Sequence, residues 1–105
     1  MSFFAHVARY EATHTPFVLA TVIETGGSTP RVAGARMAIT ADDFVGTVGG
    51  GAFEKRVIDE ARAMLVDRRS VHRLDVHLVR ELAMCCGGRM SVFFEQVEVE
   101  PRLRI

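Results

Sequence analysis

The order of hydrophobic and polar positions predicts a helix and then a buried strand in the first part of the chain. Apolar residues recur at helical spacing from Phe3 to Ala12, so an amphipathic helix is expected there. Thr13–Pro16 interrupts this pattern. Phe17–Ile23 is an almost continuous run of apolar and β-branched residues, which is typical of a central strand covered on both faces.

A glycine-rich loop, a hairpin and a second helix are predicted next. The glycines and proline of Gly26–Gly34 exclude regular structure. Arg36–Thr40 and Phe44–Val48 are short strand patterns joined by turn-forming residues, which indicates a hairpin. The helix that follows the hairpin has an apolar face made of Phe53, Val57, Ala61, Met64 and Leu65.

Two more strand patterns complete the predicted fold. Val71–Val79 alternates between polar and apolar residues, and Met90–Phe94 is a buried-strand pattern. Glu98–Ile105 is weakly patterned and is expected to fray. The order of elements predicts one α/β domain over residues 1–105, or an α+β domain, with a mixed β-sheet and two main helices.

The composition excludes some classes of partner. Thirteen basic and thirteen acidic residues give no net charge, so neither nucleic acid nor an anionic membrane is expected as a partner. Zero net charge also does little to oppose self-association, and a homo-oligomer is expected. The sequence has no apolar run of about 18 residues and no leader-like N-terminus, which predicts a cytoplasmic protein.

The two cysteines of the chain, Cys85 and Cys86, are adjacent. Neighbouring Cα atoms are about 3.8 Å apart, which is shorter than an ordinary disulfide requires, and a reducing compartment fits this usage. Cys86 precedes Gly87 and Gly88, whose backbone would allow close approach and could lower the pKa of a thiolate that acts as nucleophile or soft metal ligand. The alternative is a pair of buried, reduced cysteines that act as small hydrophobic residues.

Gly49, Gly50 and Gly51 directly precede the second predicted helix. The free backbone N–H groups of a helix start could bind a phosphate there, although a tight turn that needs glycine explains the pattern equally well. Glu54 lies in the first helical turn, where a carboxylate ordinarily stabilises the helix dipole. Its alternative role is to accept hydrogen bonds from a donor-rich heterocycle.

The first glycine loop combines hydroxyl groups, a rigid turn and arginines. Ser28, Pro30 and Arg31 are followed by Gly34 and Arg36. Arginine guanidinium groups suit oxyanions and phosphates, whereas the alternative is a surface loop with solvated arginines. The loop is therefore a candidate anion-binding segment.

Three motifs in this order resemble the N-terminal domain of the XdhC/CoxI family of xanthine dehydrogenase accessory proteins. They are Ala20–Met37, Gly46–Glu54 and Met84–Arg89, and the resemblance extends over about residues 17–94. It implies an accessory protein, not itself an enzyme, that binds the molybdenum cofactor (molybdopterin), holds it and helps insert it into a molybdenum hydroxylase such as xanthine dehydrogenase.

The resemblance also assigns the candidate site. It implies a cofactor site formed by Ser28, Pro30, Arg31, Gly34, Arg36, Gly49, Gly50, Gly51, Glu54, Cys86, Gly87 and Gly88. In that site backbone amides and arginines would hold the phosphate, Glu54 the pterin edge, and Cys86 the molybdenum or its sulfur-bearing form.

Partners and alternatives follow from the same comparison. Typical members continue into a Rossmann-like domain, whereas this sequence ends at Ile105, so a short member acting with a separate Rossmann-domain protein or as a homo-oligomer is expected. The implied partners are the apoenzyme of a molybdenum hydroxylase and a cysteine desulfurase. The alternatives are a sulfur carrier or thiol oxidoreductase that uses Cys86, and an interaction subunit without a ligand.

Overall fold

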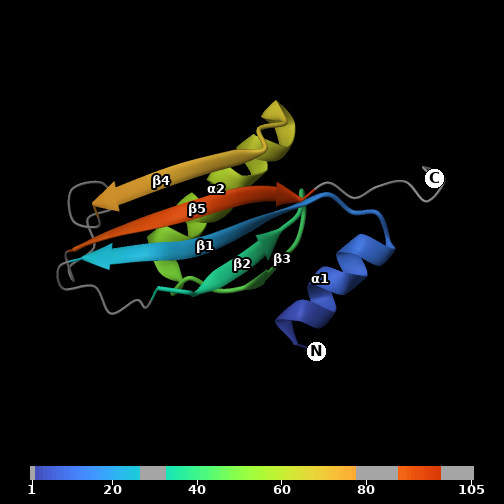
Figure 1. The fold of residues 1–105 in the computed structure, drawn as a ribbon, viewed down its shortest axis with the longest axis horizontal. Coiled ribbons are helices and arrows are strands. Elements are labelled where there is room, and N and C mark those ends of the chain that lie inside the picture. The colour runs from blue at the N-terminus through green and yellow to red at the C-terminus, as the bar shows by residue number, and fades with distance from the viewer. Residues whose placement is uncertain (1, 27–32, 78–87, 98–105) are drawn as a thin grey trace.

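The computed structural model describes residues 2–26, 33–77 and 88–97, which form two helices and a five-stranded sheet (Figure 1). The elements in chain order are α1 (Phe3–Ala12), β1 (Phe17–Gly26), β2 (Arg36–Ile39), β3 (Phe44–Gly46), α2 (Gly51–Asp67), β4 (Val71–His77) and β5 (Arg89–Val97). Each predicted helix and strand is present. None of the helices in the described ranges is long and apolar enough to cross a membrane.

The strands lie in the order β3-β2-β1-β5-β4, and all four neighbouring pairs among them are antiparallel. The predicted class, one mixed α/β unit with two helices, is confirmed, and the α+β alternative describes it best. The expected mixed sheet is corrected, because no described pair is parallel. The physical reason is the path of α2, which carries the chain from the β3 edge to the β4 edge and so places no parallel strands side by side (Figure 1).

The main core lies between α2 and one face of the sheet. Alternate residues Val18, Ala20 and Val22 of β1 face α2 and are fully buried. The helix contributes the predicted apolar face, of which Phe53, Val57, Ala61 and Met64 are buried and Leu65 is partly buried. Full burial of a large apolar side chain contributes about 1.5–3 kcal/mol, so this layer dominates the stability of the fold.

Helix α1 covers only one end of the opposite sheet face. Tyr10 packs against Phe17 and Ala38 in a second, smaller cluster, and its hydroxyl donates to Asp43 Oδ2 at 3.2 Å. Coverage of β1 on both faces is therefore confirmed only for its first part. Among the described elements none lies over this face beyond Thr21, and Ile23 is 43% exposed.

An irregularity in β1 changes which residues share a face. Val22 lies opposite Val92, but Glu24 lies opposite Ser91, so Ile23 is an additional residue in the strand. We call the sheet face opposite α2 the open face. The bulge places Glu24 on this face beside Ser91, whereas a one-to-one register would have turned Glu24 toward α2.

Candidate functional site

The predicted motifs lead toward one end of the sheet. Gly26 at the end of β1 lies opposite Arg89 at the start of β5, and Arg89 lies opposite His77 at the end of β4. Strand β3 runs in the same direction as β1, so the glycine loop after β3 continues toward that end (Figure 1). The topology thus brings the flanks of all three motifs to one side of the molecule.

The structure describes part of the predicted site. Gly34, Arg36, Gly49, Gly50, Gly51, Glu54 and Gly88 are among the described residues. The remaining candidates lie outside them; these are Ser28, Pro30, Arg31, Cys86 and Gly87. The prediction that these residues meet in one site therefore stays a prediction.

Glu54 organises the glycine loop that precedes α2. Its Oε1 accepts hydrogen bonds from Thr47 Oγ1 at 2.5 Å, from the Val48 N–H at 3.2 Å and from the Gly50 N–H at 2.9 Å. Thr47 Oγ1 in turn accepts from the Gly49 N–H at 2.9 Å. We call these four contacts the Thr47–Glu54 clasp. The clasp provides acceptors for the N–H groups of Val48, Gly49 and Gly50, part of the loop predicted to bind a phosphate. Glu54 therefore does more than interact with the helix dipole.

The first turn of α2 retains free donors. The N–H groups of Gly51, Ala52 and Phe53 have no acceptor among the described residues. A helix start with free N–H groups attracts anions, because the groups and the helix dipole both carry positive charge there. Three amides at the start of α2, rather than the whole loop, are thus the available hydrogen-bond donors among the described residues.

The backbone of Gly50 explains why glycine occurs in this loop. Its φ of 81° and ψ of −176° lie in a region that other residues adopt only under strain. Gly51 also has a positive φ, of 67°. A Cβ atom at Gly50 or Gly51 would meet nothing within 4 Å, so the loop needs glycine for its backbone and leaves the adjacent space open to a ligand.

Arg36 lies on the other face of the sheet. Its guanidinium carbon is 4.8 Å from the ring centre of Phe4 and 5.6 Å from that of Phe3, which is cation–π distance. The neighbouring Met37 faces α2, so alternation along β2 separates the side chain of Arg36 from the start of α2. Arg36 therefore attaches α1 to the sheet and is not brought together with Glu54.

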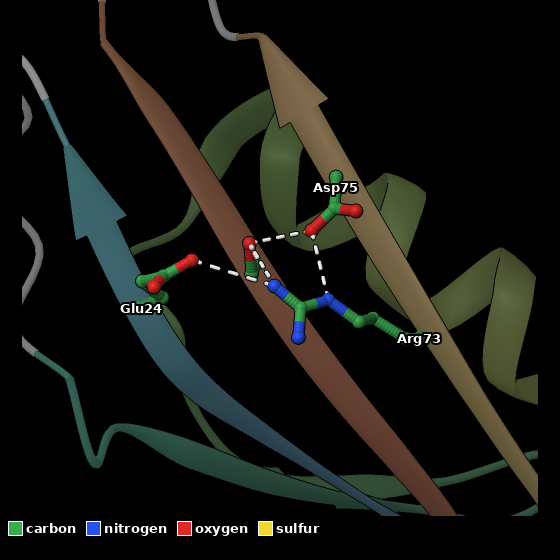
Figure 2. A network of polar contacts seen from close by, with 4 residues as sticks. Glu24, Arg73 and Asp75 are labelled. Carbon is green, nitrogen blue, oxygen red and sulfur yellow. Dashed lines mark hydrogen bonds and ion pairs between the residues drawn. The ribbon is translucent and has the colours of Figure 1, made fainter.

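A polar network crosses the open sheet face (Figure 2). Arg73 donates from Nε to Asp75 Oδ1 at 3.1 Å, and from Nη2 to Glu24 Oε1 and Ser91 Oγ at 3.4 Å each. Ser91, only 5% exposed, donates to Asp75 Oδ1 at 2.5 Å. This hydrogen bond, followed by that from Arg73, lowers the pKa of Asp75.

Sequence reasoning missed three features of this region. No sequence pattern indicated that Thr47, seven residues before Glu54, would contact it. The network of Arg73 and Ser91 depends on how β4 and β5 are paired, which the sequence does not show. Arg89 ends the third motif and has no predicted role, yet its side chain lies within 3.4 Å of where a Cβ on Gly26 would stand. Within the described ranges no group of three histidine, cysteine or acidic residues could hold a metal ion.

Comparison with known proteins places the fold in a family. Residues 11–76 match the XdhC and CoxI family, and the chain belongs to that family. The chain is 38% identical over 107 residues to YqeB, an uncharacterized protein of Escherichia coli strain K12. That alignment takes in 98% of this chain and 20% of YqeB.

A solved structure gives the same fold. The chain resembles a Bacillus halodurans protein whose crystal structure is described as that of a xanthine dehydrogenase, with a TM-score of 0.77 and 27% identity. The match covers 94% of this chain and 31% of the Bacillus chain. The chain thus spans about a fifth of one relative and about a third of the other.

Proposed function

We propose that the protein is an accessory protein of xanthine dehydrogenase maturation that binds the molybdenum cofactor. In this proposal it holds the cofactor and helps insert it into the apoenzyme of a molybdenum hydroxylase. Family membership and the likeness to the Bacillus halodurans protein support the accessory role. The cofactor would supply the molybdenum and its dithiolene sulfur, while this chain would bind and orient it.

The observation that carries the proposal is the open glycine loop at the start of α2. Free amides of Gly51 and Ala52 stand beside space that no Cβ fills, and the flanks of the other motifs leave the sheet toward the same side. These donors fit the phosphate of the cofactor. The clasp holds the loop in place before a ligand arrives, which lowers the ordering cost of binding.

Each candidate side chain has a proposed task. Arg31 would neutralise the phosphate, and Cys86 would contact the molybdenum as a soft thiolate ligand. Because Oε1 of Glu54 already accepts three hydrogen bonds, Oε2 would accept those from the pterin edge. Arg36 would contribute less, since its guanidinium lies over the Phe4 ring.

Partners and location belong to the same proposal. The acceptor would be the hydroxylase apoenzyme in the cytoplasm, with a cysteine desulfurase or a separate Rossmann-domain protein assisting. Transfer would be shown by reactivation of the purified apoenzyme on mixing with the cofactor-loaded protein.

The proposal is tested by purifying the protein anaerobically from a host that makes the cofactor, and assaying it for molybdenum and pterin. Both should be present in comparable amounts. An Arg31→Ala variant should bind about tenfold more weakly or worse, because a charge-assisted hydrogen bond contributes roughly 1.5–3 kcal/mol. Arg9→Ala, at an exposed position of α1, is the matched control. Absence of both components from the folded wild-type protein would overturn the proposal.

A further inference from the structure

The first turn of α1 contacts two of the three sequence motifs. The guanidinium of Arg36, near the end of the first motif, lies over the rings of Phe3 and Phe4 at cation–π distance. Gly46, the first residue of the second motif, lies against the ring of Phe3. Because Arg36 begins β2 and Gly46 ends β3, the turn joins the two motifs across neighbouring strands.

Glycine at position 46 is what permits this close approach. Its φ of 85° lies in the left-handed region that favours glycine. A Cβ atom there would collide with the carbonyl oxygen of Arg36 and would stand 3.1 Å from Cε1 of Phe3. Phe3 supplies the side-chain atom nearest to that position. The phenyl ring therefore packs directly on the backbone that leads into the glycine loop.

Gly46 adjoins the Thr47–Glu54 clasp. Thr47 is the next residue, and its Oγ1 both contacts Oε1 of Glu54 and accepts from the N–H of Gly49. Strand β3 is only three residues long and pairs with β2 alone among the described strands. A strand this short has little support from the sheet, so its path depends on what packs against it.

Helix α1 also holds the other end of the same hairpin. The hydroxyl of Tyr10 donates to Asp43 Oδ2 at 3.2 Å, and Asp43 lies in the turn between β2 and β3. Phe3 and Tyr10 are about two helical turns apart and contact opposite ends of β3. Helix α1 thus lies beside the hairpin and braces it from the turn to the glycine loop (Figure 1).

We propose that Phe3 is a positioning residue for the glycine loop in front of α2. Its ring holds Gly46, the backbone of Gly46 sets the place of Thr47, and Thr47 orients the carboxylate of Glu54. The helix at the N-terminus thereby controls the shape of a loop that comes more than forty positions later in the chain. The inference rests on the proposed function only where cofactor binding is measured.

Phe4 provides a matched comparison within the same turn. Its ring lies closer to the guanidinium of Arg36 than that of Phe3 does, at 4.8 Å against 5.6 Å. Phe4 is nevertheless 62% exposed, whereas Phe3 is partly buried against the second core cluster and is the ring that lies against Gly46. Removal of Phe4 should therefore weaken the contact with Arg36 and leave the loop in place.

Hydrogen exchange followed by NMR tests the inference without cofactor. In Phe3→Ala, the Gly50 amide, which donates to Glu54 Oε1, should exchange about tenfold faster than in wild type. The amide of Val57, in the buried part of α2, should change by at most about threefold, because it reports global unfolding. Phe3→Tyr keeps the ring, and both it and Phe4→Ala should leave Gly50 within about twofold of wild type.

Cofactor content gives a second measurement. After anaerobic purification from a host that makes the cofactor, Phe3→Ala should hold about a third or less of the molybdenum per protein found in wild type and in Phe4→Ala, because its loop must be ordered on binding. A wild-type protein without molybdenum would refute the proposed function, and hydrogen exchange would then decide this inference alone. Equal acceleration of Gly50 and Val57 in Phe3→Ala, no acceleration of Gly50, or equal effects of Phe3→Ala and Phe4→Ala on Gly50 overturns it.

Discussion

Thr47 and Glu54 are joined across the glycine loop, with Oγ1 of the threonine 2.5 Å from Oε1 of the carboxylate. The same oxygen accepts from the N–H groups of Val48 and Gly50, so one carboxylate fixes the chain on both sides of Gly49. The loop is consequently held by contacts within the protein itself.

Removing the carboxylate should destabilise the protein. Glu54→Ala leaves two loop amides without their acceptor, and a loss of about 1–2 kcal/mol in the free energy of unfolding is expected. Denaturant unfolding measures it. Asp59→Ala is the matched control on the same helix, where an exposed pair with Lys55 should cost about 0.5 kcal/mol or less. Equal losses in the two variants would contradict the role of the clasp.

Substitution of Gly50 should cost stability through backbone strain alone. The φ and ψ of this residue suit only glycine, so Gly50→Ala should lose about 1–3 kcal/mol in the free energy of unfolding. Because nothing lies within 4 Å of the added Cβ, Gly50→Ser should lose the same amount. A larger loss for serine than for alanine would indicate crowding and would count against this explanation.

Asp75 should titrate below its ordinary pKa of 3.8. A carboxyl group with a lowered pKa stabilises the folded state above its unfolded pKa, and that contribution is lost as the pH falls through the folded pKa. Ser91→Ala removes the largest cause, so the pKa of Asp75 should rise toward 3.8 in that variant. NMR titration of the carboxyl group measures this change, and an unaltered pKa in Ser91→Ala would refute it.

The single tyrosine of the chain reports how α1 is held. Burial, followed by the charge and hydrogen bond of Asp43, raises the pKa of Tyr10 above 10.0. The neutral phenol therefore stabilises the fold below the unfolded pKa, and this stabilisation is lost as the pH rises through the folded pKa. Ultraviolet titration follows Tyr10 alone, because the sequence has one tyrosine and no tryptophan.

Two variants separate the causes of the Tyr10 shift. Asp43→Asn should lower the pKa of Tyr10 clearly, whereas Asp42→Asn should lower it only slightly, since Asp42 is the smallest contributor. If both variants had the same effect, the contact of Tyr10 with Asp43 would not hold α1 as described.

Periodicity was sufficient to predict the elements of this fold. The helical spacing from Phe53 to Met64 identified the buried face of α2, because residues three or four positions apart lie on the same face of a helix. The apolar run at Phe17–Ile23 identified a central strand but overstated its coverage. Hydrophobicity alone does not show that a bulge sets in at Ile23 or that α1 stops short of it.

The candidate site was less accessible to sequence reasoning. The position of Glu54 in the first helical turn predicts an interaction with the helix dipole or with a ligand. Its contacts with Thr47 and Val48 depend on the path of the preceding turn, which three consecutive glycines do not determine. Proximity in sequence predicts that Arg36 belongs to the anion-binding loop that precedes it. Its actual neighbours, Phe3 and Phe4, come from an element more than thirty positions away, a contact that no local pattern encodes.

The most direct test of the proposed cofactor site compares the molybdenum-to-protein ratio of Cys86→Ser with that of Cys85→Ser after anaerobic purification. The proposal predicts a marked loss of molybdenum in Cys86→Ser and a ratio near that of wild type in Cys85→Ser, because only Cys86 would contact the metal. Retention of wild-type molybdenum by folded Cys86→Ser would contradict the proposed site.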